Sequence, residues 1–302
     1  MSKNTNKLVR VLSILVFGIV FYIGAALMFL GSGWGHSLVV SDNADAVSKT
    51  GLTAKKAKAN AKKKTSYDAS KTKSVSASEL WKAKQYPAYS IGRMSVPAVN
   101  IHNPLFNGYG SAGQNLSYGV CTVVPGREMG GVNNYVLAGH YMGSYGAAVL
   151  DNLHYIKNGD LICVTDMEKI YLYKATYKSY AVKPTQIEVE NNVQGKKLIT
   201  LITCSDFDVS RYGYGQHRTV VQGVLAGTVK ATKKNLETCE LTDKPQKKAK
   251  AVALSKNGVK EVAKRVEEKW YQKITLQQVV IAFSLLWLIV VGTMIVKACK
   301  KS

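Results

Sequence analysis

The sequence predicts an all-β domain, either a closed barrel or a sandwich, with one membrane-spanning segment on each side of it. Three observations carry this prediction. Two apolar runs near the chain ends are almost free of charge, short strand-like runs alternate with turns between them, and basic residues gather in the intervening flanks. The expected divisions of the 302-residue chain are 1–7, 8–30, 31–85, 86–229, 230–273, 274–296 and 297–302.

The first apolar run, Leu8 to Leu30, is long enough to cross the roughly 30 Å hydrocarbon core of a membrane. Arg10, near its start, is its only charged residue. A cleaved signal peptide is the alternative, but its apolar region would hold only about 7–15 residues, followed by a small-residue cleavage site. No clear site of that kind follows the run, so we expect an uncleaved anchor.

The second apolar run extends from Ile274 to Val296. Basic residues lie on the outer end of each run, namely Lys3, Lys7, Arg10, Lys297, Lys300 and Lys301. Because loops that stay in the cytoplasm are enriched in Lys and Arg, this pattern predicts that both termini are cytoplasmic. Residues 31–273 are then expected outside the cell, held at the cell membrane.

The net charge of +22 suggests a nucleic-acid partner, but its distribution argues against one. Residues 49–85 hold 11 basic and 2 acidic side chains, residues 230–273 hold 13 and 6, and residues 86–229 hold 11 and 9. A nucleic-acid-binding domain would carry the basic face on its folded part, whereas the expected domain here is nearly neutral.

The two lysine-rich flanks are therefore expected to be solvated linkers. The alternative is that they also contact an anionic lipid surface or wall polymer. In the second flank, apolar side chains at helical spacing predict an amphipathic helix on the membrane or an ordinary charged helix: Val259, Val262, Val266 and Trp270.

Between the flanks, β-branched and aromatic runs predict six strands. These are 93–96, 134–137, 161–165, 170–177, 197–203 and 219–226. Residues 166–169 are expected to form the hairpin turn between the third and fourth strands. Helical pattern is scarce, with one short piece expected near residues 147–153.

The five cysteines, at irregular spacing and without a C-x-x-C pair, indicate neither a disulfide framework nor a zinc site. Cys204 follows a strand-like run and precedes a Gly- and Tyr-rich loop, which favours a partly exposed nucleophile. Cys121 and Cys163 lie inside apolar runs and are expected to be small buried hydrophobes. Cys239 lies in the outer flank and Cys299 in the cytoplasmic tail.

A nucleophilic thiolate needs a base and a group that stabilises the oxyanion. His140 ends a strand-like run and is one candidate base, although a lone histidine is more often structural. His217, thirteen positions after Cys204, is the rival. Arg218 begins the strand after the Cys204 loop, and its guanidinium would lie beside the thiol if the two strands are antiparallel neighbours. The alternative is a solvated arginine at a strand edge.

Three segments together resemble the sortase family. The run Thr200-Leu201-Ile202-Thr203-Cys204 is similar to that family's T-L-x-T-C signature, Ala138-Gly139-His140 to its histidine motif, and the run from Arg218 to Gly223 to its arginine strand. The resemblance covers about residues 90–228 and is strongest to the class A group, with Gln194 where that group often has Pro. It implies an eight-stranded β-barrel.

The resemblance also implies an activity. Sortases cut a Leu-Pro-x-Thr-Gly sorting signal of secreted proteins between Thr and Gly, through a thioacyl-enzyme, and transfer the protein to a cell-wall precursor amine. Cys204 would be the nucleophile, His140 the acid and base, and Arg218 the oxyanion partner, with no cofactor required. The implied groove residues are Ala138, Ile202 and Thr203, the last also helping to hold the substrate or the oxyanion.

Two features leave alternatives open. Some class A sortases bind calcium on the loop corresponding to residues 182–196, where Glu188 and Glu190 are the candidate ligands or simply solvated side chains. The second membrane segment is more typical of pilin-polymerising class C sortases, yet their Asp-Pro lid motif is absent from the sequence. A hydrolase on the same barrel, a non-catalytic wall-binding module and a signalling ectodomain are further alternatives.

Overall fold

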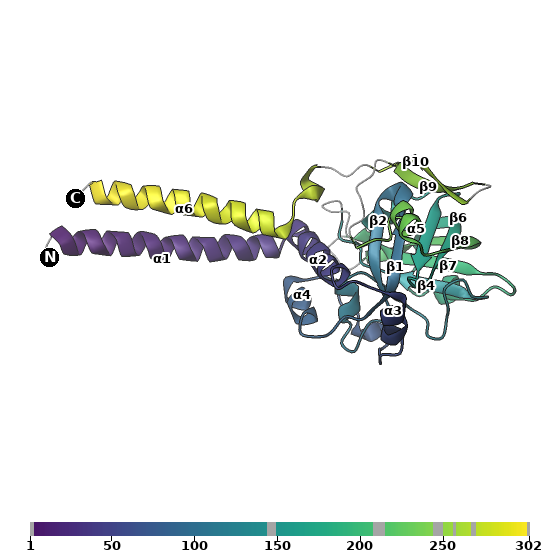
Figure 1. Cartoon of the computed structure of the whole chain (residues 1–302). Helices are drawn as coiled ribbons and strands as arrows, with labels where there is room; N and C mark the ends of the chain where they lie inside the picture. Colours follow the sequence, from purple (N-terminus) through teal and green to yellow (C-terminus); the bar gives the residue numbers. More distant parts are fainter. Residues whose placement is uncertain are drawn as a thin grey trace.

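The computed structural model describes residues 3–143, 149–207, 215–243, 250–255, 258–266 and 270–300. Two long helices lie side by side and lead to a β domain covered by shorter helices and a small hairpin (Figure 1). Both chain termini lie at the end of the helix pair that is farthest from the β domain (Figure 1).

The β domain is a closed barrel of eight strands in the order β1-β2-β3-β4-β7-β8-β6-β5. The β2/β3 and β4/β7 pairs are parallel, and the other pairs are antiparallel. The strands are β1 Ser90–Val96, β2 Ile101–Phe106, β3 Val120–Thr122, β4 Asn134–Ala138, β5 Leu161–Thr165, β6 Lys169–Val182, β7 Leu198–Phe207 and β8 Gly215–Lys230. The all-β prediction and the eight-stranded barrel are both confirmed.

All six strands predicted from the sequence are present, but two others were not predicted. The missed strands are β2, which contains Asn103 and Pro104, and β3, which has only three residues. Asp166 forms the predicted turn between β5 and β6, since its carboxylate accepts hydrogen bonds from the backbone of Glu168 and Lys169. The helix expected at residues 147–153 is a 3₁₀ turn, η4 (Asp151–Tyr155), with residues 147–148 outside the described part.

Alternation along β7 separates the inside of the barrel from its outer face. Ile199 and Leu201 belong to the main hydrophobic cluster, and Thr203 is buried beside them. Ile202 and Cys204 point the other way and are partly exposed. The side chains of Ile202 and Cys204 therefore project from the outer face of the sheet, where they are accessible.

The N-terminal flank differs from the solvated linker predicted from its composition. It forms α2 (Gly33–Ser48), α3 (Ala54–Ala61), the 3₁₀ turn η1 (Ala69–Lys71) and α4 (Ala77–Ala83). Val40 and Leu80 are 1% and 2% exposed and belong to the main cluster of the barrel. The lysines of α3 remain exposed. The average composition hides a few well-placed apolar side chains that hold the segment on the barrel.

The C-terminal flank is also folded. It consists of α5 (Lys233–Thr238), the β9/β10 hairpin (Lys250–Ser255 and Gly258–Ala263) and η6 (Trp270–Lys273). The predicted amphipathic helix is wrong, because residues 258–263 are a strand. Val259 and Val262, three positions apart, lie on opposite faces of that strand and pack against two different hydrophobic clusters. A spacing that matches a helix also fits a strand covered on both faces.

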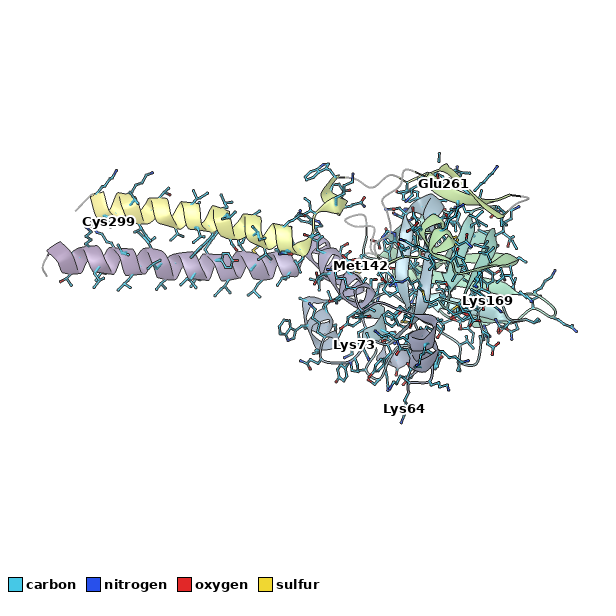
Figure 2. The ribbon with its side chains drawn as sticks, in the orientation of Figure 1. Lys64, Lys73, Met142, Lys169, Glu261 and Cys299 are labelled. Atoms are coloured by element: carbon cyan, nitrogen blue, oxygen red, sulfur yellow. The ribbon has the colours of Figure 1, made fainter. Side chains whose placement is uncertain are left out.

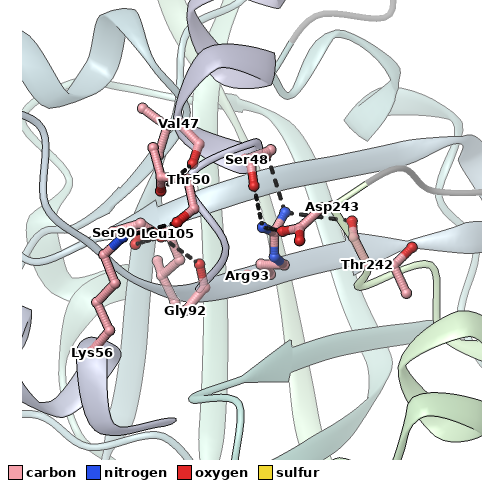
Figure 3. A network of polar contacts seen from close by, with 10 residues as sticks. All are labelled: Val47, Ser48, Thr50, Lys56, Ser90, Gly92, Arg93, Leu105, Thr242 and Asp243. Carbon is pink, nitrogen blue, oxygen red and sulfur yellow. Dashed lines mark hydrogen bonds and ion pairs between the residues drawn. The ribbon is translucent and has the colours of Figure 1, made fainter. Parts of the chain in front are cut away.

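Arg93 on β1 joins the two flanks to the barrel (Figure 3). Its guanidinium donates to the hydroxyl and carbonyl oxygens of Ser48, to the carbonyl oxygen of Thr242, and to the carboxylate of Asp243. The Arg93 residue is only 6% exposed. Burial lowers the pKa of Arg93, and Asp243 acts in the opposite direction.

The two terminal helices are α1 (Lys3–Leu30) and α6 (Leu276–Lys300), and both are long and apolar enough to cross a membrane. Tyr22 hydrogen-bonds with Ser284 at 2.8 Å, and the indole of Trp287 donates to the carbonyl oxygen of Gly18 at 2.8 Å. A side chain at Gly18 would approach Val291 to 2.9 Å, so glycine allows the helices to pack closely.

Candidate active site

Cys204 and Arg218 are direct cross-strand partners on the outer face of the barrel. The β7/β8 register pairs Cys204 with Arg218, and residues directly opposite each other project to the same side of a sheet. Both side chains are partly exposed. The antiparallel neighbourhood on which the prediction for Arg218 depended is therefore present.

The same register separates His217 from the thiol. His217 is paired with Ser205, one step along each strand from the Cys204 pair. Because successive side chains point to opposite faces, His217 projects from the face that Arg218 does not use. This rival base is therefore on the wrong side of the sheet for Cys204.

The parallel β4/β7 pair positions the segment that carries His140 beside the end of β7. Ala138 is paired with Ile202, and the Gly139 amide donates to the carbonyl oxygen of Ile202 at 3.1 Å. His140 lies two residues beyond the end of β4, and it lines the same pocket as Cys204. The hydroxyl of Thr203 donates to the carbonyl oxygen of Gly139 at 2.8 Å, which fixes the end of β4 against β7.

All of these residues line one groove of about 960 Å³. Its walls include the three candidate catalytic residues and the three candidate groove residues: Cys204, His140, Arg218, Ala138, Ile202 and Thr203. Strands that are distant in sequence bring these six side chains together, and a groove of this size can accept several residues of an extended peptide.

The surroundings of His140 favour its neutral form. Although the residue keeps partial exposure, burial of the imidazole lowers its pKa from 6.5 to about 4. The adjoining Gly139 has no room for a side chain, since an added Cβ would approach Val149 to 2.6 Å. Leu150 donates its amide to the His140 carbonyl at 3.3 Å. At neutral pH the imidazole can therefore accept a proton.

The Thr203 hydroxyl is already used as a donor. Its single proton is given to Gly139, so in this arrangement it cannot also be donated to an oxyanion. The observed bond instead aligns the strand ends that carry His140 and Cys204. A direct contact of Thr203 with the substrate or the oxyanion, which the resemblance implies, stays a prediction.

Gly215, at the start of β8, contributes to the site and was not predicted. The Nη1 atom of Arg218 donates to the carbonyl oxygens of Gly215 and His217, at 2.9 and 3.1 Å. A Cβ at Gly215 would approach the Cβ of Cys204 to 2.7 Å. A glycine in a strand beside a candidate nucleophile was the available signal, since such glycines often mark a close approach.

The N-terminal flank forms another wall of the groove, which its composition did not indicate. The contributing residues are Gly31, Gly33, His36, Ala69, Thr72, Lys73, Ser74 and Val75. Lys73, before α4, and Met142, in the loop after β4, mark two sides of this region in Figure 2. Gly31 directly follows α1, so the groove begins where the first apolar helix ends.

Glu188 and Glu190 lie on the 3₁₀ turn η5 (Ile187–Glu190). Burial raises the pKa of Glu190, and the charge of Arg127 opposes that shift. The Arg127 guanidinium donates to the backbone carbonyl of Glu190, which places a cation beside this turn. Within the described ranges, no three His, Cys, Asp or Glu side chains gather as a metal site. Calcium binding by Glu188 and Glu190 stays a prediction, and we derive no step through it.

The other cysteines lie away from the groove. Cys121 is fully buried in a separate hydrophobic cluster, and burial raises its pKa well above its ordinary value. Figure 2 shows Cys299 on α6 near the far end of the helix pair. Among these environments, only that of Cys204 combines partial exposure with a neighbouring arginine and histidine.

Comparison with known proteins agrees with the geometry. A family model described as Sortase domain matches residues 94–226. Sortase A of Streptococcus agalactiae is 39% identical over 152 residues, covering 49% of this chain and 60% of that protein. Sortase A of Bacillus anthracis is 38% identical over 162 residues, covering 53% and 71%. The solved sortase A of Listeria monocytogenes is 29% identical, with a TM-score of 0.44, covering 51% of this chain and 98% of that one.

Proposed function

This chain belongs to the sortase family, and from that premise we propose that it is a membrane-anchored cysteine transpeptidase. It cuts a Leu-Pro-x-Thr-Gly-like signal between Thr and Gly and transfers the protein to a cell-wall amine. The observation that carries the proposal is the register of β4, β7 and β8, which brings His140, Cys204 and Arg218 to one groove.

In the first half of the reaction, the Cys204 sulfur attacks the Thr carbonyl carbon of the signal. The imidazole of His140, which its lowered pKa keeps neutral at pH 7, accepts the thiol proton. The carbonyl oxygen becomes an oxyanion beside the Arg218 guanidinium, which two backbone carbonyls hold in place. As the C–N bond breaks, the imidazolium returns its proton to the departing glycine amine, leaving a thioester.

In the second half, an acceptor amine enters the groove and attacks the thioester carbonyl. His140 now removes a proton from the amine, and the Cys204 thiol is regenerated as the new amide forms. The same three side chains therefore serve both halves with their proton roles reversed. If water replaces the amine, the identical residues carry out hydrolysis.

We place the barrel outside the cell and both termini in the cytoplasm. The terminal helices are apolar and lie side by side, with their free ends together (Figure 1). Basic residues flank those free ends, which favours retention on the cytoplasmic side. The clients are then secreted proteins with C-terminal sorting signals, and the acceptor is a peptidoglycan-precursor amine at the membrane. The exposed lysines of α3 face anionic lipid or wall polymer.

The test uses the full chain in detergent micelles, because Val40 and Leu80 of the N-terminal flank are part of the barrel's core. A Leu-Pro-x-Thr-Gly peptide and an oligoglycine amine are supplied, with and without calcium, and mass spectrometry follows the products. We expect a ligated product that requires Cys204 and does not require calcium. Cys121→Ala, which alters a buried thiol outside the groove, is the matched control.

The second apolar helix favours one alternative, the pilin-polymerising reaction, in which a lysine side chain is the acceptor. The same assay with a lysine-bearing peptide as acceptor distinguishes the two, since polymerisation predicts preference for that amine. Cleavage without ligation to either amine would indicate a hydrolase. Binding to wall polymer without cleavage, unchanged in Cys204→Ala, would replace the proposal with the non-catalytic wall-binding module.

A further inference from the structure

Two buried cysteines join the barrel to the C-terminal flank. Cys163 lies on β5, and Cys239 directly follows α5. Both residues are 0% exposed, and they lie in the same buried hydrophobic cluster. About 75 residues separate the two cysteines in the chain, so folding alone brings the sulfur atoms together.

The backbone around the two cysteines holds them in this contact. Ser95 on β1 is the cross-strand partner of Cys163, and the Ser95 hydroxyl donates to the carbonyl oxygen of Cys239. The sulfur atoms lie in a hydrophobic cluster on the outer face of the barrel, with Leu161, Ile170, Leu172, Leu241 and Val252. The thiols are thus placed by packing and backbone bonding on both sides.

We propose that Cys163 and Cys239 form a disulfide bond in the exported protein, which ties the C-terminal flank to the outer face of the barrel. The proposal rests on the extracellular location given in the proposed function, since disulfides persist outside the cytoplasm. It goes beyond the expectation from spacing, which indicated no disulfide framework.

The oxidant is an organic disulfide, either a small molecule or an exported disulfide-bearing oxidoreductase. One chain thiolate attacks the oxidant and forms a mixed disulfide, which releases the first thiol of the oxidant. The second chain thiolate then attacks the chain's own sulfur in that mixed disulfide and releases the second thiol. Two chain thiols are oxidised to one disulfide, and the oxidant is reduced to two thiols.

Burial determines when this exchange takes place. Both sulfurs are inaccessible in the folded chain, and the contact with Cys239 together with desolvation raises the pKa of Cys163. Exchange requires an accessible thiolate, so the bond forms while the C-terminal flank docks rather than afterwards. The same burial then protects the bond from reduction and leaves Cys204 as the accessible thiol of the barrel.

The test is a map of cysteine oxidation in the full chain, isolated from the membranes of an exporting host that contains a thiol oxidase. N-ethylmaleimide is present from lysis onward, and the protein is then denatured and digested without reductant. We expect one peptide pair crosslinked through Cys163 and Cys239, with maleimide on the other three of the five cysteines. Maleimide on both Cys163 and Cys239 overturns the proposal.

A thermal measurement checks that the bond ties the flank to the barrel. Unfolding is compared for the wild type, Cys239→Ala and the control Cys121→Ala, each with and without prior incubation with a phosphine reductant just below the Tm, where transient opening exposes the buried bond. We expect the reductant to lower the Tm by roughly 10 °C in the wild type and in Cys121→Ala only. An equal reductant effect in Cys239→Ala, or none in the wild type, contradicts the proposal. Neither measurement depends on ligation activity, so this proposal and the proposed function can fail separately.

Discussion

A cysteine and an arginine occur together in two regions of this barrel, with opposite consequences. At the rim, formed by Cys204, Arg218, His140 and Gly215, the side chains border a groove and are partly exposed. The seam is formed by Cys163, Cys239, Arg93, Ser48, Thr242 and Asp243. There Arg93 is buried against both flanks, and the two cysteines are buried between the barrel and the C-terminal flank. The same residue types face a substrate at the rim and hold segments together at the seam.

The difference teaches that partners, rather than residue type, decide the role of a side chain. Arg218 is held by two backbone carbonyls at one nitrogen, which orients its charge toward a groove. The Arg93 guanidinium instead binds oxygens from both flanks (Figure 3). Substitutions at the rim are therefore expected to reduce the ligation rate. Substitutions at the seam are expected to reduce the free energy of unfolding.

The largest expected effect is the loss of ligation when the Cys204 thiol is removed. Cys204→Ala is expected to lower ligation by about 10⁴-fold or more, because it removes the atom that forms the thioester. Its Tm should stay close to the wild-type value. Cys121→Ala should ligate normally and unfold at a lower temperature, since it leaves a small cavity. Ligation by mass spectrometry and thermal unfolding measure both; substantial ligation by Cys204→Ala would remove the rim from the mechanism.

The two arginines give the next largest contrast. Arg218→Lys should lower kcat/KM by about 100-fold with little change in Tm, because a lysine cannot reproduce the oriented guanidinium beside the oxyanion. Arg93→Met should cost about 3 kcal/mol of unfolding free energy, because it removes a buried guanidinium that binds both flanks and leaves the oxygens of Ser48 without that donor, while folded molecules keep their activity. Equal stability losses in both variants would abolish the distinction between rim and seam.

The pKa of His140 predicts a pH dependence of stability. The unfolded histidine binds a proton near its ordinary value of 6.5 and the folded one at about 4. As pH falls from 7 to 4, the unfolded chain therefore takes up the proton first and the folded state loses stability, by about 3 kcal/mol. Below about 4 this loss is complete. His140→Asn should reduce the fall in Tm over this range, and an unchanged slope would show that burial does not disfavour the imidazolium.

The smallest expected effect comes from Gly215→Ala. The added methyl group has to displace the neighbouring Cys204, from which it would be separated by 2.7 Å. We expect about a tenfold loss in kcat, because small misplacements of a nucleophile are costly. Gly227→Ala, on the same strand with open space around the added Cβ, is the control and should leave the rate unchanged. Equal kcat values for Gly215→Ala and Gly227→Ala would mean that the rim accommodates the added methyl group without loss of activity.

The features that could be predicted from the sequence are those that depend on short runs of neighbouring residues. Alternating apolar runs indicated six of the eight barrel strands. Cys204 and Arg218 lie near a strand end, and His140 lies just beyond one. The strand register brings these three positions to one groove. That register depends on the pairing of β4 with β7, which are far apart in the sequence. It also excluded His217, which its distance along the chain from Cys204 could not do.

The flanks were mispredicted because composition averages over positions. In the N-terminal flank, Val40 and Leu80 are enough to join it to the core, although lysines dominate the segment. In the C-terminal flank, Lys264 and Glu240 form a buried ion pair, with 2.6 Å between the lysine Nζ and the glutamate Oε1. The sequence alone does not show that these two residues are neighbours. Gly215 was missed because its significance is the distance to Cys204, which only the pairing of β7 and β8 creates.

Gly31, the first residue after α1, lines the same groove as Cys204. With α1 seated in a membrane as proposed, the thiol works next to the lipid headgroups and has no long tether on which to search. Enzyme, client and acceptor then meet by diffusion in two dimensions, where confinement raises their effective concentration. A client must therefore present its cleavage site close to its own membrane exit, and one released into solution would leave the enzyme's reach.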